Sequence, residues 1–240
     1  MYLHVPFCAA RCGYCDFTTY TADELGPGVD PGGYPEAVLA ELDLAHRVLG
    51  EADVRRPVST VFVGGGTPTL LPPDGLVRML DGVRERFGVR PGAEITVEAN
   101  PDSVTPDGLV ALAAAGVTRM SFGVQSAVPH VLAVLERTHG PSAVPRVVAW
   151  SRDAGLAVSL DLIYGTPGES VDDWRATVDA ALDCAPDHVS AYSLVVEPGT
   201  RLAARVRRGD LPGTDEDDLA VKYEVAERRL SAAGFGWYEV

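Results

Sequence analysis

The chain has 240 residues, 46% hydrophobic and 22% charged, and its 34 acidic and 20 basic side chains give a net charge of −14. This balance is typical of a globular protein, and so acidic a surface repels phosphate backbones, which argues against a nucleic-acid-binding protein. No apolar run approaches the ~18 residues that span a bilayer and no signal-peptide pattern opens the chain, so we expect a cytoplasmic protein without a transmembrane segment, with peripheral membrane contact left open.

The predicted elements alternate along the chain. Apolar runs rich in β-branched residues predict strands at residues 2–6, 58–65, 94–101, 119–126, 157–165 and 188–197. Amphipathic segments predict helices at residues 34–50, 72–88, 105–116, 141–155, 170–183 and 214–233, the last with Thr214 as N-cap. Residues 18–33 are polar and rich in glycine and proline, which predicts a loop, and residues 234–240 read as a further strand.

Strands that alternate with helices form parallel sheets with right-handed crossovers. An open doubly wound sheet and a complete or partial barrel both fit this order. Glycines and polar residues follow many of the strands, namely Gly64–Pro68, Glu98, Asn100, Gln125, Asp161 and Glu197. A barrel builds its site from many strand ends, whereas a doubly wound sheet binds its ligand mainly at one switch point. We therefore favour a six-stranded barrel-like fold.

Three of the four cysteines, Cys8, Cys12 and Cys15, follow the first strand with the spacing C-x3-C-x2-C. Thiolates on a loop suit zinc or an iron–sulfur cluster. A structural zinc needs four ligands, and no fourth cysteine or well-spaced histidine follows. Three thiolates on a [4Fe–4S] cluster would leave one iron open for a substrate or cofactor. Three buried thiols without a ligand are the remaining interpretation, and the distant Cys184 is predicted to be a small buried hydrophobe.

The cysteine motif resembles the signature of radical S-adenosylmethionine (SAM) enzymes, and "YLHVPFC" and "CGYCDF" resemble the branch like oxygen-independent coproporphyrinogen III oxidase. Further motifs of that branch follow in order: "GGGTPTLL", "VEANPDS", "RMSFGVQS", "LERTH", "DLIYGTPGES", "AYSLVVEPGT" and "GFGWYEV". The resemblance implies a partial TIM-type (β/α)6 barrel, with residues 1–240 as the radical SAM core domain. Family members continue into a C-terminal domain, which we expect to be missing here.

The resemblance also implies the cofactors and their ligands. Cys8, Cys12 and Cys15 would bind a [4Fe–4S] cluster, and SAM would occupy the open iron. The implied SAM-binding residues are Tyr2, Tyr14, Gly65, Gly66, Thr67, Glu98, Gln125, Arg137 and Asp161. The residue chemistry agrees, because glycines let backbone approach a ligand and an arginine pairs with a carboxylate. The glycines also fit a simple tight turn, and no catalytic residue is assigned.

Position 17 separates two branches of this family. The true oxidase carries a further cysteine two residues after the third, and this chain has Phe17 there. This departure resembles the haem-chaperone branch, whose members bind haem and deliver it to haemoproteins. That function would need client haemoproteins and an electron donor for the cluster, and it leaves open whether the protein is an enzyme. The alternatives are the oxidase of porphyrin biosynthesis, which decarboxylates coproporphyrinogen, and a structural zinc module.

The sequence does not identify a haem ligand. The candidates are His4, His46, His130, His139 and His188, and none has a local signature of ligation. The oligomeric state is likewise not predicted.

Overall fold

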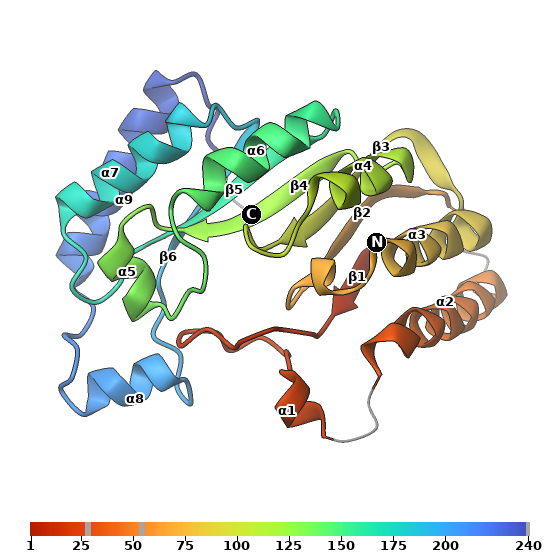
Figure 1. The fold of residues 1–240 in the computed structure, drawn as a ribbon, viewed down its shortest axis with the longest axis horizontal. Coiled ribbons are helices and arrows are strands. Elements are labelled where there is room, and N and C mark those ends of the chain that lie inside the picture. Colours follow the sequence, from red (N-terminus) through yellow and green to blue (C-terminus); the bar gives the residue numbers. More distant parts are fainter. Residues whose placement is uncertain (27–29, 53–55, 239–240) are drawn as a thin grey trace.

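Six parallel strands form one sheet in the computed structural model, which describes residues 1–26, 30–52 and 56–238 (Figure 1). The strands pair in chain order: β1 (Tyr2–Val5), β2 (Val58–Gly65), β3 (Val89–Ala99), β4 (Arg119–Gln125), β5 (Ala157–Tyr164) and β6 (His188–Ser193). A doubly wound sheet would reverse this order at its switch point. The sheet ends at β1 and β6, so the predicted partial (β/α)6 barrel is confirmed.

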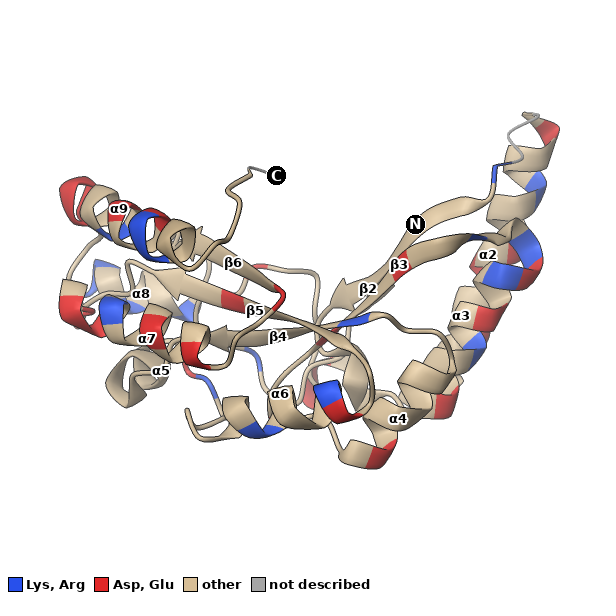
Figure 2. Ribbon diagram, turned by 90° about the horizontal axis from the view of Figure 1, so that it is seen from above, with Lys and Arg blue, Asp and Glu red and all other residues tan. Residues whose placement is uncertain are grey.

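The helices follow the strands. They are α1 (Ala22–Leu25), α2 (Tyr34–Glu51), α3 (Pro73–Phe87), α4 (Pro106–Ala114), α5 (Pro129–Val134), α6 (Ala143–Asp153), α7 (Val171–Asp183), α8 (Arg201–Arg207) and α9 (Glu216–Ala232). Helices α2, α3, α4 and α6 lie along one side of the curved sheet (Figure 2). Proline in the first turn starts α3, α4 and α5, where a missing N–H costs nothing.

Alternation along the strands gives the sheet two different faces. The outer face meets the helices with fully buried apolar side chains such as Val97, Phe122 and Leu160. The opposite face, which we call the inner face, carries polar residues one position away in each strand. Glu98 pairs in register with Ser121, and Gly123 pairs with Asp161. The outer face therefore forms the core, and the inner face keeps polar groups for a site.

Some predicted boundaries are wrong. Strand β3 begins at Val89, five residues before the predicted start, and β6 ends at Ser193, four residues before the predicted end. Helix α9 begins after Asp215 instead of Thr214, because the Asp215 carboxylate accepts hydrogen bonds from the N–H groups of Asp217 and Asp218. An aspartate is as good an N-cap as a serine or threonine.

Short elements were missed. Residues 18–33, predicted as a loop, contain α1 and a 3-10 turn at Pro31–Gly33, and residues 27–29 of that loop lie outside the described residues. Helices α5 and α8 were not predicted, because six or seven residues show too few turns of periodicity. The predicted final strand is wrong for residues 234–238, and residues 239–240 lie outside the described part. No helix within the described ranges is long and apolar enough to cross a bilayer.

Candidate cofactor site

The cysteines lie on a loop of residues 8–15, here called the cysteine loop. Its base is closed by two backbone hydrogen bonds, from the Cys8 N–H to the Tyr20 carbonyl at 3.0 Å and from the Tyr20 N–H to the Pro6 carbonyl at 2.7 Å. A third joins the Cys15 N–H to the Cys12 carbonyl at 3.3 Å. All three thiols are free and half-buried. The loop therefore presents its sulfur atoms as available ligands.

The three thiols lie close enough to influence one another. Burial raises the pKa of Cys8 and of Cys15, and the charges of neighbouring thiolates raise both pKa values further. Thiolates that repel one another gain stability when cationic iron binds between them. The donor set therefore fits an iron–sulfur cluster, which is held by cysteine thiolates.

A single metal ion fits the site less well. Across residues 1–26, 30–52 and 56–238, no group of three or more His, Cys, Asp or Glu side chains is arranged to hold one ion. A structural zinc gathers four donors around one ion, whereas the thiolates of a cluster bind separate irons. The cysteine loop offers three thiols, and residues 8–15 contain no fourth donor for zinc.

The turn at residues 64–68, here called the glycine turn, includes the end of β2 and packs directly against the cysteine loop. The Gly66 N–H donates to the Val5 carbonyl at 2.8 Å, and the Thr67 N–H donates to the Phe7 carbonyl at 2.7 Å. A Cβ on Gly66 would lie 2.5 Å from the Phe7 carbonyl oxygen and 3.0 Å from the Cys8 sulfur. Glycine is thus required for close approach to the first cysteine, which a simple tight turn would not explain.

Arg137 connects the cysteine loop to the polar strand ends. Its Nη1 donates to the Cys12 sulfur at 3.2 Å, and its Nη2 donates to the Asn100 side chain at 2.5 Å and to the Gly123 carbonyl at 2.7 Å. Asn100 in turn donates to the Thr67 hydroxyl at 3.1 Å. Cys12, Thr67, Asn100 and Arg137 border a cavity of about 120 Å³.

One donor of Arg137 stays unused. Its Nε is buried and has no hydrogen-bond partner among the described residues. A buried guanidinium N–H next to a cavity suits an additional anionic acceptor, and a carboxylate is the partner that arginine binds best. The Arg137 Nε is therefore available to donate a hydrogen bond to a carboxylate, such as the carboxylate of SAM.

Glu98 forms a second polar centre on the inner face. Its Oε2 accepts a hydrogen bond from the Gly65 N–H at 3.0 Å. Burial raises the pKa of Glu98 to about 7, and the nearby charge of Asp161 raises it as well. Asp161 accepts from the Ser121 hydroxyl at 2.9 Å, and burial raises the pKa of Asp161 too. Tyr2 lies on the same face, and burial and the nearby charge of Glu98 both raise the pKa of Tyr2.

Gln125 and Tyr14 are held by their surroundings. Gln125 ends β4 at a register shift relative to β5, is 8% exposed and has a φ of 63°. A bulge with a left-handed non-glycine residue is uncommon and re-aims a side chain next to a site. Burial raises the pKa of Tyr14, and the neighbouring charge of Arg137 opposes this. Gln125 therefore lies near Gly123, and Tyr14 lies near Arg137.

The predicted residues therefore form two groups joined by the glycine turn. Tyr14, Gly66, Thr67 and Arg137 lie with the cysteines, and Tyr2, Gly65, Glu98, Gln125 and Asp161 lie along the inner face and the end of β4. The sequence prediction did not assign Asn100 to the site, although it follows a strand among the other polar residues. Its hydrogen bond to Arg137 could not be predicted, because that contact depends on where the fold places the loop after α5.

The histidines have different environments. His4 hydrogen-bonds to the Tyr2 hydroxyl at 2.8 Å, and His188 to the Ser159 hydroxyl at 2.8 Å. His139 is buried, and burial lowers its pKa to about 4. His46 and His130 lie on the surface. Cys184 is buried in the main core, which confirms its predicted role as a small hydrophobe.

Replacing Glu98 with Gln should change the pH dependence of folding. A folded pKa of about 7 lies above the ~4.3 of an unfolded glutamate. The wild-type protein therefore loses stability as pH rises between these two values, because the carboxyl ionises readily in the unfolded chain while the buried carboxyl of the folded chain stays protonated. Glu98→Gln keeps an acceptor for Gly65 and should be more stable than wild type by about 1–3 kcal/mol near pH 8, with little difference near pH 4.

Urea denaturation of the metal-free protein at several pH values measures this difference. The exposed Glu94 on the same strand provides the control variant Glu94→Gln for a change in surface charge. Parallel stability curves for wild type and Glu98→Gln would contradict a buried, protonated Glu98.

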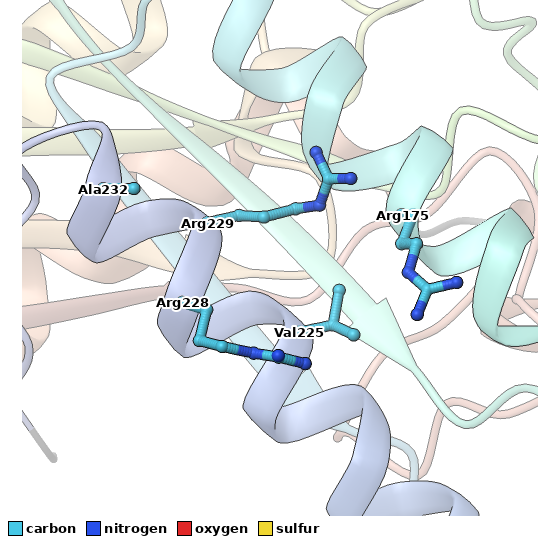
Figure 3. A pocket seen from close by; sticks show the side chains of 5 residues that line it. All are labelled: Arg175, Val225, Arg228, Arg229 and Ala232. Carbon is cyan, nitrogen blue, oxygen red and sulfur yellow. The ribbon is translucent and has the colours of Figure 1, made fainter.

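A larger cavity lies away from these residues, between α7 and α9 (Figure 3). It measures about 340 Å³ and is lined by Arg175, Val225, Arg228, Arg229 and Ala232. Two of its arginines already have carboxylate partners, since Arg175 pairs with Asp172 and Arg229 with Asp179. None of the predicted site residues lines this cavity.

Two curated heme chaperones are similar to this chain over its whole length. The heme chaperone HemW of Mycobacterium tuberculosis (strain ATCC 25618 / H37Rv) is 53% identical over 241 residues, which cover all of this chain and 60% of that protein. The heme chaperone HemW of Escherichia coli (strain K12) is 37% identical over 244 residues, covering all of this chain and 61% of that protein. The chain thus spans about 60% of the length of these relatives.

A solved structure shares the fold. Coproporphyrinogen III oxidase (HemN) from Escherichia coli superimposes with a TM-score of 0.82 and 24% identity over all of this chain and 54% of the oxidase chain. The family model "Radical SAM superfamily" matches residues 2–181, which contain the cysteine loop, the glycine turn, Glu98 and Arg137. The chain therefore belongs to the radical SAM superfamily.

Proposed function

We propose that this chain is the radical SAM core of a haem chaperone, which binds haem and delivers it to haemoproteins. Membership of the superfamily implies a [4Fe–4S] cluster and SAM as cofactors. The observation that carries the chaperone assignment is the 53% identity to HemW along the whole chain. The likeness to HemN, at 24% identity, supports the fold alone. In the proposal, residues 1–240 form one core domain of a cytoplasmic protein.

Position 17 supports the same choice. Phe17 stands where the oxidase branch has its additional cysteine, and its side chain is 64% exposed. An exposed phenylalanine offers no thiolate there, so chemistry that depends on this cysteine would be absent. The proposal therefore places the protein with the chaperones instead of the decarboxylating enzymes.

The chain's own residues have distinct parts in this proposal. Cys8, Cys12 and Cys15 hold the cluster, which supplies an electron to SAM when both are bound. Arg137 would hold the carboxylate of SAM with its unused Nε, and it orients the Cys12 sulfur through Nη1. The glycine turn brings backbone groups of Gly65, Gly66 and Thr67 to the same place.

The inner-face residues would surround the nucleoside. Glu98 offers a half-protonated carboxyl near neutral pH, which both donates and accepts hydrogen bonds and so suits ribose hydroxyls. Tyr2, Gln125 and Asp161 would complete this lining, and Tyr14 on the cysteine loop would also lie beside the nucleoside. The proposal also requires an external electron donor for the cluster and client haemoproteins that would accept the haem.

A paired assay under anaerobic conditions tests the function. The reconstituted protein should bind haem in a spectroscopic titration and should leave coproporphyrinogen unchanged. The HemW protein of Mycobacterium tuberculosis, which is longer than this chain, is titrated in parallel. Haem binding by the longer protein alone would place the haem site outside residues 1–240, and turnover of coproporphyrinogen by this chain would refute the chaperone assignment.

A further inference from the structure

The middle of the cysteine loop is held by segments far away in the sequence. Between Cys12 and Cys15, the Gly13 N–H donates to the Leu135 carbonyl at 3.3 Å, and the Gly13 carbonyl accepts from the Leu202 N–H at 2.8 Å. Leu135 directly follows α5, and Leu202 lies on α8. The spacing of the second and third cysteines therefore depends on these two helices.

Glu136 lies against the same glycine. A Cβ on Gly13 would be 2.9 Å from the carboxyl carbon of Glu136, so the carboxyl group occupies the space that a side chain would need. Glu136 also has a φ of 57°, a conformation that a non-glycine residue adopts only when its surroundings hold it there. The contact between Glu136 and Gly13 is thus built into the loop that follows α5.

Arg201 joins Glu136 to the cysteine loop. Its Nε donates to Glu136 Oε2 at 2.9 Å and its Nη2 to the same oxygen at 2.5 Å. The same Nη2 also donates to the backbone carbonyl of Arg11, the residue before Cys12. One guanidinium therefore binds both the carboxylate and the loop backbone, in the fork geometry that arginine provides and lysine does not.

The helix that carries Arg201 is well anchored. The Thr200 side chain caps α8 by accepting from the Ala203 N–H at 3.1 Å. Leu202 is 1% exposed and belongs to a small core, separate from the main one, whose other buried members are Val131, Leu135, Ile163 and Leu194. Tyr14 packs against this small core. The cysteine loop, through Tyr14, and α8, through Leu202, therefore pack in the same small core.

We propose that Arg201 and Glu136 are positioning residues that hold the cysteine loop in the conformation that takes up and keeps the iron–sulfur cluster. They act on Cys12 and Cys15 through Gly13 and the Arg11 carbonyl. The proposal rests on the cluster site proposed above. It adds two residues that neither the cysteine motif nor the SAM-binding set includes.

The rate at which a chelator removes the cluster tests this proposal. Arg201→Ala should lose the cluster about 10-fold faster than wild type, as is typical when a partner behind a metal ligand is removed, and its electron paramagnetic resonance spectrum should broaden or shift. The melting temperature of the metal-free protein should stay unchanged, because Arg201 is exposed. Arg208→Ala is the matched control, since Arg208 directly follows α8 and pairs with Asp210.

Two further variants separate positioning from folding. Glu136→Gln keeps the shape at Gly13 and removes the charge, so it should lose the cluster at a rate between wild type and Arg201→Ala. Arg201→Lys should restore only part of the retention, because one ammonium cannot reproduce the fork. Equal chelation rates for wild type and Arg201→Ala would overturn the proposal, and so would loss rates that simply follow the melting temperatures of the metal-free variants.

The outcome of this chelation experiment does not depend on whether the protein binds haem. If wild type binds no cluster, the proposed function fails, and if wild type binds one that Arg201→Ala retains equally well, only the positioning role fails.

Discussion

Cys12→Ala is expected to abolish cluster binding while the barrel stays folded. Cys12 lies on a loop outside the main core, and its sulfur accepts from Arg137 instead of packing among apolar side chains. Without one of three thiolates, the cluster loses a ligand, and the fourth cysteine, Cys184, is buried in the main core. Iron per protein after anaerobic reconstitution should therefore fall close to zero, with the circular dichroism spectrum and melting temperature of the metal-free protein unchanged.

The fourth cysteine supplies the control for this experiment. Cys184→Ala removes a thiol that lies in the main core, so it should keep the full cluster content and lose some stability instead, about 1 kcal/mol for a small buried side chain. Unfolding of Cys12→Ala without iron would show that the thiol has a structural role, and normal iron content would exclude Cys12 as a ligand.

Lys222→Met is expected to destabilise the fold by about 3–5 kcal/mol, the cost of leaving a buried charge without its partner. Lys222 on α9 is 1% exposed and Glu169 is buried, with 3.4 Å between the Lys222 Nζ and Glu169 Oε2. The lysine also donates to the Glu169 carbonyl at 2.7 Å and pairs with Asp218 at 2.5 Å. Glu169 in turn accepts from the Gly165 N–H at 2.7 Å, just after β5.

Chemical denaturation measures this loss of stability, and the dependence of the loss on pH provides a second test. Burial raises the pKa of Glu169, and removing the lysine should raise it further. The loss in Lys222→Met should therefore shrink as pH falls, because a protonated Glu169 tolerates burial. Adding Glu169→Gln should recover part of the stability, since Gln still accepts from Gly165.

Arg229→Met on the same helix is the control. Arg229 and its partner Asp179 are both partly exposed, and such pairs contribute only about 0–1 kcal/mol. If Lys222→Met were no more destabilising than Arg229→Met, the ion pair inside the fold would not be needed to hold α9 against the loop after β5.

The long elements could be predicted because their signals are local. The strand at 58–65 was predicted with the bounds of β2, and the helices at 34–50 and 170–183 differ from α2 and α7 by one residue at one end. Their apolar residues repeat over several turns or alternate along a strand, so the pattern does not depend on neighbours. Helices α5 and α8 are too short for such a pattern and form because Val131 and Leu202 are buried in one small core.

The candidate site likewise has some features that can be predicted from the sequence and others that cannot. The cysteine spacing and Phe17 can be read from the chain, because a ligand motif is a local arrangement of residue types. The links between Asn100 and Arg137, between Gly66 and Cys8, and between Arg201 and the Arg11 carbonyl join segments that are far apart in the sequence. Such contacts leave no periodic signal.

By itself, the sequence determined the alternating strands and helices, the parallel sheet and the residue types of a three-thiolate cluster site. These follow from side-chain periodicity and from the donor chemistry of cysteine, both of which are local. Only the tertiary structure decided how Arg137 reaches the cysteine loop, how burial places the pKa of Glu98 near neutral pH, and how α8 and Glu136 hold Gly13. Those properties depend on packing between distant segments, which folding alone brings together.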